Sequence, residues 1–341
     1  MNRKLASIQK ITKIHSIPGK DFIAVADILG WKVIIRKDEF KEGDLCIYCE
    51  IDSILPAHIE FEFLRSKNYR IKTMKMHNIL SQGIAFPLDI IPKITPAIKV
   101  EKNVVYFENS TLTLTEGKEI SGLIKVKKYM PPVVGMGQNN PKGNLPFFIT
   151  KTDEPRIQSE PQQLEYIKGM PWYATVKIDG TSATYAYRDR HIYVCSHNLQ
   201  LKESETSAYW KIYYKYNFKK ILKDYKHIVI QGEIAGPKIQ KNRLDLEERK
   251  LFIFNVIAEH KNYGYEEIKM FCEKYNLTMV PLEQKGNKFD FTLEELLEMA
   301  KGKYKSGKLR EGLVFRPQAG IYSSPCRISF KVLNNNFLLK E

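Results

Sequence analysis

The sequence predicts a two-domain α+β chain, in which a small β-barrel precedes a larger domain that mixes strands with helices. Two observations support this prediction. The 341 residues are too many for one compact core and suit two domains. Up to about residue 120, short apolar runs alternate with turn residues, whereas later segments also carry helical periodicity. We therefore expect the barrel over residues 1–120.

The strands of the first domain are predicted from its apolar and β-branched runs. Such runs occupy residues 23–30, 31–36 and 45–48, and the turn residues Glu42-Gly43-Asp44 separate the last two. Residues 81–88 read as a further strand that enters a turn. Strands of this length and spacing are typical of a small barrel.

A cluster of cations lies between these strands of the first domain. Small barrels of the OB type often bind single-stranded nucleic acid in a basic groove. A solvated basic loop is an equally good interpretation, so no individual contact is assigned. The residues concerned are Arg65, Lys67, Arg70, Lys72 and Lys75.

The second domain is expected over residues 147–341, after a linker at 121–146 that is rich in Pro, Gly and Asn. Residues 207–218 are dense in aromatic residues and lysine, but Tyr209, Ile212, Tyr213 and Tyr216 recur at helical spacing. This spacing favours a helix packed on the core over a surface that stacks on bases. Residues 293–300 read as a surface helix with Thr292 as its N-cap.

The composition favours a protein of a reducing, intracellular compartment. The five cysteines are odd in number and scattered, which argues against a secreted disulfide framework, and the lone Cys46-x-x-Cys49 pair reads as ordinary strand residues. No apolar run approaches membrane-spanning length, so we expect no membrane partner and a cytoplasmic or nuclear location. A net charge of +15 favours a polyanionic partner, although a merely basic surface would give the same total.

The most informative segment is Lys177-Ile178-Asp179-Gly180, which follows a β-favouring run that begins at Trp172. This pattern places a lysine at the end of a strand, beside a turn where glycine permits close backbone approach. Such a lysine suits covalent catalysis, because an amine attacks phosphorus when neighbouring cations lower its pKa. By itself the motif is short enough to recur by chance.

Further segments occur in a fixed order around this lysine. They are residues 147–158 before it, and 194–198, 231–237, 251–256, 310–316 and 328–332 after it. The series resembles the nucleotidyltransferase motifs of the covalent ligase and capping-enzyme superfamily. The layout of the whole chain is most similar to the ATP-dependent RNA ligases with an N-terminal OB domain, the Naegleria type. The resemblance implies an OB-type barrel followed by an adenylyltransferase domain, ATP-grasp-like, of antiparallel sheets and helices.

The resemblance also implies roles for individual residues. Lys177 would be the nucleophile that becomes AMP-lysine, Glu233 would contact the ribose and Phe254 would stack on adenine, with Phe252 as a competitor for that role. Glu311 would bind the catalytic Mg²⁺ or Mn²⁺, with Glu233 as a second metal-binding carboxylate, and Lys331 would hold the α-phosphate. The other residues expected to bind nucleotide are Arg156, Gln158, Val176, Ile178, Asp179, Gly180 and His197.

Two positions depart from the family pattern. His197 stands where an arginine is common, which puts a phosphate contact there in doubt because histidine is shorter and often neutral. Ser329 stands where the first of two lysines is common, and Arg327 is a candidate for compensating the lost charge.

The resemblance implies an enzyme that joins RNA 3′-OH and 5′-phosphate ends through lysyl-AMP and an adenylylated 5′ end, with ATP as substrate. We expect a monomer that acts in RNA repair. The chain ends ten residues after Lys331, which leaves no room for the second barrel of capping enzymes and most DNA ligases. A DNA ligase, a capping-type transferase and an inactive nucleic-acid-binding relative stay as alternatives.

Overall fold

The structure is a computed structural model that describes residues 3–130, 140–322 and 327–340. The chain forms two compact units. The first contains residues 1–131 together with 158–161 and 338–341, and the second contains residues 132–157 and 162–337. Of the segment expected as a linker, 121–146, residues 131–139 lie outside the described residues, and its extent stays a prediction.

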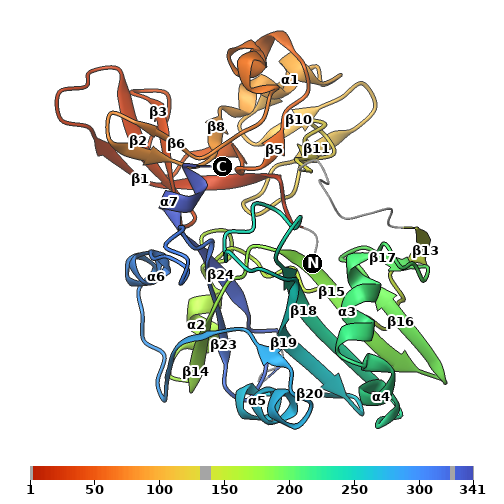
Figure 1. Cartoon of the computed structure of the whole chain (residues 1–341). Helices are drawn as coiled ribbons and strands as arrows, with labels where there is room; N and C mark the ends of the chain where they lie inside the picture. The colour runs from red at the N-terminus through yellow and green to blue at the C-terminus, as the bar shows by residue number, and fades with distance from the viewer. Residues whose placement is uncertain (1–2, 131–139, 323–326, 341) are drawn as a thin grey trace. The chain divides into compact units, whose positions relative to one another are not determined.

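The first unit is built on a five-stranded antiparallel sheet of order β3-β2-β1-β4-β8 (Figure 1). Its strands are β1 (Ala6–Ser16), β2 (Ile23–Ile28), β3 (Trp31–Arg36), β4 (Leu45–Cys49) and β8 (Ile84–Phe86). The sheet curls until its edges approach each other, because the Gln82 N–H donates to the Lys32 carbonyl at 2.9 Å and the Ile34 N–H donates to Ser81 Oγ at 3.0 Å. The result is the nearly closed barrel that the sequence predicts.

Shorter elements complete this unit. They are β5 (Ser53–Ile54), the 3₁₀ helix η1 (Ile59–Lys67), β6 (Met74–Met76), β7 (Ile79–Ser81), η2 (Leu88–Ile90), α1 (Ile91–Ile94), β9 (Lys99–Glu101), β10 (Val104–Tyr106), β11 (Thr111–Thr113) and β12 (Lys127–Lys128). The core inside the barrel includes Trp31, Tyr48 and Phe61, all fully buried. Cys46 and Cys49 lie in the same core as free thiols, in agreement with their interpretation as ordinary strand residues.

The second unit contains two sheets. The larger has the order β13-β17-β16-β15-β18-β19-β20, with β21 paired to β19, and the smaller has the order β22-β14-β23-β24. The strands of the larger sheet are β13 (Pro141–Asn144), β15 (Thr181–Arg188), β16 (His191–Cys195), β17 (Leu199–Leu201), β18 (Ile228–Ala235), β19 (Lys250–Ala258), β20 (Lys261–Asn262) and β21 (Thr278–Met279). Those of the smaller sheet are β14 (Trp172–Val176), β22 (Leu282–Gly286), β23 (Gly312–Pro317) and β24 (Phe330–Leu333).

Helices complete the unit. They are α2 (Gln163–Ile167), α3 (Ala208–Lys215), α4 (Phe218–Lys223), α5 (Tyr265–Lys274), α6 (Leu293–Ala300) and α7 (Asn335–Leu338), whose last residue belongs to the first unit. Helix α3 buries Tyr209, Ile212 and Tyr213 against the larger sheet, as its apolar spacing predicts. Helix α6 packs on the smaller sheet, and Thr292 caps it by accepting a hydrogen bond from the Glu295 N–H. The α+β class is thus confirmed, and the strand pairs of the two sheets are antiparallel except for the parallel pair of β19 and β21.

Candidate active site

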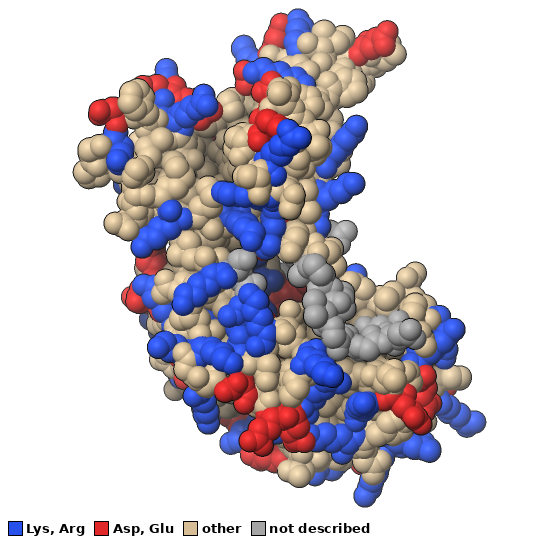
Figure 2. Space-filling view, turned by 45° about the horizontal axis from the view of Figure 1, so that its top comes forward, with Lys and Arg blue, Asp and Glu red and all other residues tan. Residues whose placement is uncertain are grey.

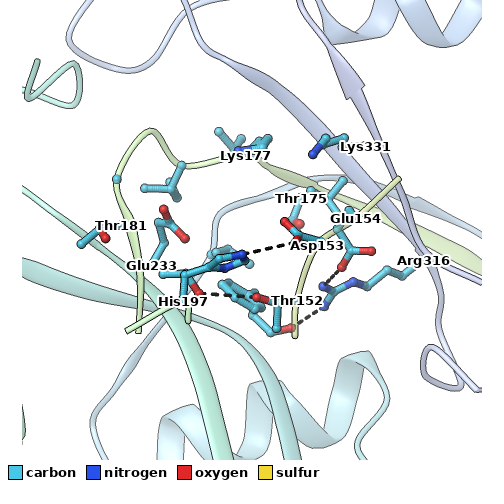
Figure 3. Close-up of a pocket in the computed structure, with 17 residues that line it drawn as sticks. Thr152, Asp153, Glu154, Thr175, Lys177, Thr181, His197, Glu233, Arg316 and Lys331 are labelled. Atoms are coloured by element: carbon cyan, nitrogen blue, oxygen red, sulfur yellow. Dashed lines mark hydrogen bonds and ion pairs between the residues drawn. The ribbon is translucent and has the colours of Figure 1, made fainter. Parts of the chain in front are cut away.

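Lys177 lies where the chain leaves one sheet of the second unit and enters the other. It directly follows β14 of the smaller sheet, and β15 of the larger sheet begins at Thr181. A cavity of about 290 Å³ opens between strands of both sheets at this crossover. The residues that line it are Thr152, Asp153, Glu154, Thr175, Val176, Lys177, Ile178, Gly180, Thr181, Ser182, His197, Glu233, Phe254, Val280, Val314, Arg316 and Lys331 (Figure 3).

The amine of Lys177 is held by a carboxylate from a distant part of the chain. Its Nζ lies 2.7 Å from Glu311 Oε2, and the two side chains are 25% and 20% exposed. Burial by itself acts to lower the pKa of Lys177, but the charges of Glu311 and Glu233 outweigh it and raise that pKa above its usual value. The amine is therefore protonated at neutral pH in this arrangement.

Glu233 contributes a second carboxylate close to the lysine. Burial, with the charges of Glu311 and Asp179, raises the pKa of Glu233 to about 8, although Lys177 acts in the opposite direction. Asp179 is the third carboxylate of this group, and its Oδ2 lies 2.9 Å from Nε of Arg243. The site thus gathers three carboxyl groups close to one amine, and carboxylate oxygens are the donors that Mg²⁺ and Mn²⁺ prefer.

Gly180 allows the turn after Lys177 to pass close to β18. A Cβ atom at this position would collide with the carbonyl oxygen of Ile234 and would lie 2.9 Å from Cγ of Glu233. No side chain fits there. The close backbone approach expected from the Asp-Gly turn is present in the structure.

The two candidate aromatic residues of β19 differ in their access to the cavity. Both pack in or against the cluster that contains Ile178 and Val280, but Phe252 is 7% exposed and does not line the cavity, whereas Phe254 does. Phe254 is therefore the residue available to stack on a bound base. Its ring also lies 5.7 Å from the guanidinium carbon of Arg316.

Lys331 reaches the cavity from β24, and a neighbouring segment fixes its backbone. Its N–H donates to the Pro155 carbonyl at 2.8 Å, and its own carbonyl accepts from the Ile157 N–H at 3.1 Å. Arg156 lies between these two partners and forms the β-bridge with Lys331. Arg156 does not line the cavity but belongs to the segment that positions Lys331.

Gln158 and Asp179 also stay outside the cavity lining. Gln158 is 1% exposed and belongs to the first unit, where its carbonyl accepts from the Gly30 N–H at 2.9 Å. Glu311 reaches the site only through its ion pair with Lys177. Nucleotide contacts of Gln158, Arg156 and Asp179 stay predictions. Eight of the predicted residues do meet at the cavity, and they are Val176, Lys177, Ile178, Gly180, His197, Glu233, Phe254 and Lys331.

His197 lies on the cavity wall beside an acidic residue. Its Nε2 is 3.2 Å from Asp153 Oδ2, and its side chain is 33% exposed. The histidine that replaces the common arginine therefore has an acidic partner from the segment before the nucleophile.

A buried charge cluster closes the end of the cavity opposite Thr181 and Glu233 (Figure 3). Glu154 accepts from Arg316 at 2.6 Å and from Arg327 at 3.0 Å. Burial acts to raise the pKa of Glu154, but the two guanidinium groups more than offset it and hold that pKa below its usual value. Arg316 lines the cavity and Arg327 does not, so Arg316 is the additional cation of this wall.

Several lining residues were not predicted from the sequence. Asp153, Glu154 and Arg316 lie within the motif segments but received no role, since charge by itself does not distinguish a cavity wall from a surface. Thr181 and Ser182 begin strand β15, four and five residues after Lys177. This closeness in sequence to the nucleophile was the one indication that they would line the cavity. Thr175, Val280 and Val314 carry no chemical signal at all.

Glu311 and Glu233 are the two residues predicted to bind Mg²⁺ or Mn²⁺. Within residues 3–130, 140–322 and 327–340, no group of three or more His, Cys, Asp or Glu side chains has the geometry of a metal site. Glu233 and Glu311 are two oxygen donors that act on each other electrostatically. Carboxylates suit Mg²⁺ or Mn²⁺, which commonly completes its coordination with substrate phosphates and water. The residues therefore fit a cation that arrives with a nucleotide.

The cations expected to line a groove of the first unit differ in their surroundings. Arg65 has a 75% exposed side chain and pairs with Glu62. Arg70 is held within the unit, because it pairs with Asp52 at 2.8 Å and its guanidinium lies 3.5 Å above the ring of Tyr129. The nucleic-acid groove stays a prediction. Among the described helices, none is long and apolar enough to cross a membrane.

Comparisons with known proteins agree with this site. A family model described as an OB-fold domain matches residues 5–88, and the RNA ligase family model matches residues 170–333. The comparison with curated proteins found no match.

Solved structures of the Naegleria gruberi RNA ligase match the whole chain. The structure with pyrophosphate is 29% identical, has a TM-score of 0.87, and covers 100% of this chain and 99% of that one. A lysine-to-methionine mutant with AMP and Mn is 29% identical, has a TM-score of 0.86, and covers 99% of both chains. A lysine-to-alanine mutant with ATP and Mn is 28% identical, has a TM-score of 0.85, and covers 99% of both. With a barrel in its first unit, a lysine-centred cavity in its second and these matches over its full length, the chain is similar throughout to the RNA ligases that carry an N-terminal OB domain.

Proposed function

We propose that this RNA ligase uses ATP to join RNA 3′-OH and 5′-phosphate ends, with Lys177 as the covalent nucleophile. The observation that carries the proposal is the position of the Lys177 amine. The Nζ atom lies 2.7 Å from Oε2 of Glu311. Lys177 lines a cavity that Glu233, Phe254 and Lys331 also line. The matched Naegleria structures hold ATP, AMP or pyrophosphate, which are the substrate and products that such chemistry requires.

In the first step Nζ of Lys177 attacks the α-phosphorus of ATP. A phosphorus–nitrogen bond forms, and the bond from the α-phosphorus to the oxygen that bridges to the β-phosphate breaks, so that pyrophosphate leaves. The ammonium group loses two protons to solvent in all, one before the attack and one after it, and the phosphoramidate nitrogen keeps one. The ion pair with Glu311 has to open first, because a protonated amine has no electron pair to offer. Lys331 is placed to neutralise charge on the α-phosphate, Phe254 to stack on adenine and Glu233 to accept from a ribose hydroxyl.

Two further steps complete the seal. A 5′-phosphate oxygen attacks the phosphorus of the lysyl adenylate, which breaks the phosphorus–nitrogen bond and returns Lys177 to its free form. A 3′-OH then attacks the 5′-phosphorus of the adenylylated end, so that a phosphodiester forms and AMP leaves. Lys331 and Arg316 both line the cavity and keep positive charge near the transferred groups.

Glu311 and Glu233 would hold Mg²⁺ or Mn²⁺ in this scheme. When bound, such a cation supplies Lewis-acid stabilisation of charge on the phosphates. The excess of carboxylates around Lys177 is the feature of this chain that supports the assignment. Glu311→Ala is expected to abolish sealing, and near-normal joining by that variant would contradict the role.

The RNA partner is inferred from family and charge. The chain carries a net charge of +15, and Figure 2 shows Lys and Arg side chains spread over much of the face in view. Such a surface attracts a polyanion without reading its sequence. We further infer that the protein acts in RNA repair as an intracellular monomer, which size-exclusion chromatography and tagged localisation would test.

Labelled ATP tests the central step. Purified protein with α-labelled ATP and Mn²⁺ should acquire one adenylate that is labile to acid and stable to base, on the peptide containing Lys177. The Lys177→Ala variant is the negative control, and Lys168→Ala is a matched control because that lysine lies outside the cavity lining. An unmodified wild-type peptide under every metal would refute the proposal and favour an inactive nucleic-acid-binding relative.

A capping-type transferase and a DNA ligase would behave differently in the same assays. Labelling by GTP in place of ATP would indicate a capping-type transferase. Nicked RNA, nicked DNA and hybrid duplexes, each with a 5′-phosphate, should be compared for sealing. Preference for DNA strands at the nick would identify a DNA ligase instead.

A further inference from the structure

Tyr304 occupies the centre of a hydrogen-bond network beside Lys177, although it does not line the cavity. It lies in the connection between α6 and β23 and is 8% exposed. Its hydroxyl donates to the Lys177 carbonyl at 2.7 Å, and it accepts from the N–H groups of Asp179 and Glu311, each at 3.2 Å. One donor and two acceptor positions are all that a tyrosine hydroxyl offers, so its hydrogen-bonding capacity is fully used.

These bonds join the backbones of the two residues whose side chains form the ion pair of the site. The backbone N–H of Lys177 donates to the Gly312 carbonyl at 2.9 Å, and its carbonyl accepts from Tyr304. The backbone N–H of Glu311 donates to Tyr304, and its carbonyl accepts from the Asn334 N–H at 2.9 Å. All four backbone groups are therefore held, and a single oxygen atom connects the two residues.

The turn after Lys177 depends on such external support. Residues 177–180 lie between β14 and β15, which belong to different sheets, so no regular strand ladder holds them. Lysine carries its amine on a flexible four-carbon stem, and the direction of that stem follows from the backbone. A small misplacement of a reacting group can reduce a rate by about a hundredfold.

We propose that Tyr304 is a positioning residue for lysine adenylylation, a role that rests on the proposed function of Lys177. Its hydroxyl fixes the position of the Lys177 backbone relative to the Glu311 backbone. It touches no reacting atom, so its effect is on geometry rather than on nucleotide affinity. Removal of the oxygen would leave one carbonyl and two N–H groups without this partner in a buried place.

The Tyr304→Phe variant tests the role, because it keeps the ring and deletes only the hydroxyl. Tyr185→Phe is the matched control, since Tyr185 is also buried and its hydroxyl donates to a backbone carbonyl, that of Tyr209, at 2.9 Å. Single-turnover adenylylation with labelled ATP and Mn²⁺ would give both the maximal rate and the ATP concentration at half-maximal rate. We expect Tyr304→Phe to slow the maximal rate by about tenfold or more while the half-maximal concentration stays within about twofold. Tyr185→Phe should change neither.

Amide hydrogen exchange adds a readout that does not depend on ATP. Well below the unfolding temperature, Tyr304→Phe should accelerate exchange at the Asp179 and Glu311 amides and leave the β18 amides unchanged. A wild-type rate in Tyr304→Phe, or faster exchange throughout the unit, would overturn the positioning role. Absence of adenylylation in the wild type itself would overturn the proposed function and the positioning role together, so the two failures are distinguishable.

Discussion

Nε of Arg316 lies 3.0 Å from Oγ of Ser329. Arg316 belongs to β23, and Ser329 directly precedes β24, which pairs with β23. Ser329 is the position where the family commonly has a lysine, and it is 1% exposed. Arg316 also donates to Glu154 at 2.6 Å and to the Phe254 carbonyl at 2.5 Å. A lysine in place of Ser329 would add a third cation beside a carboxylate that already binds Arg316 and Arg327. The serine is therefore compatible with a site whose positive charge is supplied from the adjacent strand.

The buried pair of Arg316 and Glu154 predicts a large effect on stability. Arg316→Met keeps an apolar stem but leaves Arg327 as the one cation beside the Glu154 carboxylate among the described residues, so we expect the second unit to lose about 3–5 kcal/mol of unfolding free energy. Denaturant titration would measure this loss. Arg188→Met is the control, because Arg188 pairs with the 72% exposed Asp189 and should cost less than about 1 kcal/mol. Equal losses in the two variants would contradict the assigned importance of the buried pair.

The raised pKa of Glu233, about 8, predicts how stability depends on pH. Without nucleotide or metal, the folded carboxyl stays protonated between pH 4.5 and about 8, where the unfolded one is ionised. The folded state thus binds more protons, and stability should fall as pH rises through this window, by up to about 1.4 kcal/mol per pH unit. Glu233→Gln should flatten this slope in thermal unfolding, whereas Glu248→Gln, at a residue with a 64% exposed side chain, should not. A wild-type slope in Glu233→Gln would rule out the assignment.

The ion pair of Lys177 and Glu311 predicts a change in amine reactivity. Glu311→Gln removes the strongest of the charges that raise the pKa of Lys177, and burial then acts to lower it. We expect the pH at which an amine-reactive reagent labels Lys177 to fall, although Glu233 and Asp179 still act to raise that pKa. Mass spectrometry of the labelled peptide would show this without any need for activity. Glu283→Gln is the control, since Glu283 pairs with Arg310 instead, and an unchanged labelling profile in Glu311→Gln would contradict the prediction.

The close approach at Gly180 predicts that even a methyl group is harmful there. Gly180→Ala would push its Cβ against the Ile234 carbonyl and toward Glu233, so we expect a loss of about 1–3 kcal/mol and a strong decrease in adenylylation. Gly143→Ala is the control, because nothing lies within 4 Å of a Cβ at that position. Unchanged stability in Gly180→Ala would show that the turn can move away from β18.

The sequence by itself determined the local features of this protein. Apolar alternation identified the front barrel, helical spacing identified α3, and the order of short motifs identified Lys177 and most of the predicted cavity residues. These signals are local in the chain, because strand and helix periods repeat every few residues and each motif occupies a single strand end or turn.

Only the tertiary structure decided which distant residues meet. Phe252 and Phe254 are two positions apart, and strand alternation alone would place both on one face. Both do contact the cluster that contains Ile178 and Val280, but Phe254 lines the cavity and Phe252 does not. Phe254 is the position at which the pairing of β18 with β19 shifts, since Gln231 pairs with Asn255 but Gly232 pairs with Ile253.

The charged wall and the tyrosine network likewise depend on contacts between distant segments. Arg316 replaces Arg327 as the cation of the cavity wall because β23 carries its side chain to the cavity. Tyr304 gains its place through a hydroxyl that bonds to backbone groups 127 and 125 residues earlier in the chain. Backbone groups are the same in every residue, so no sequence pattern records such a contact.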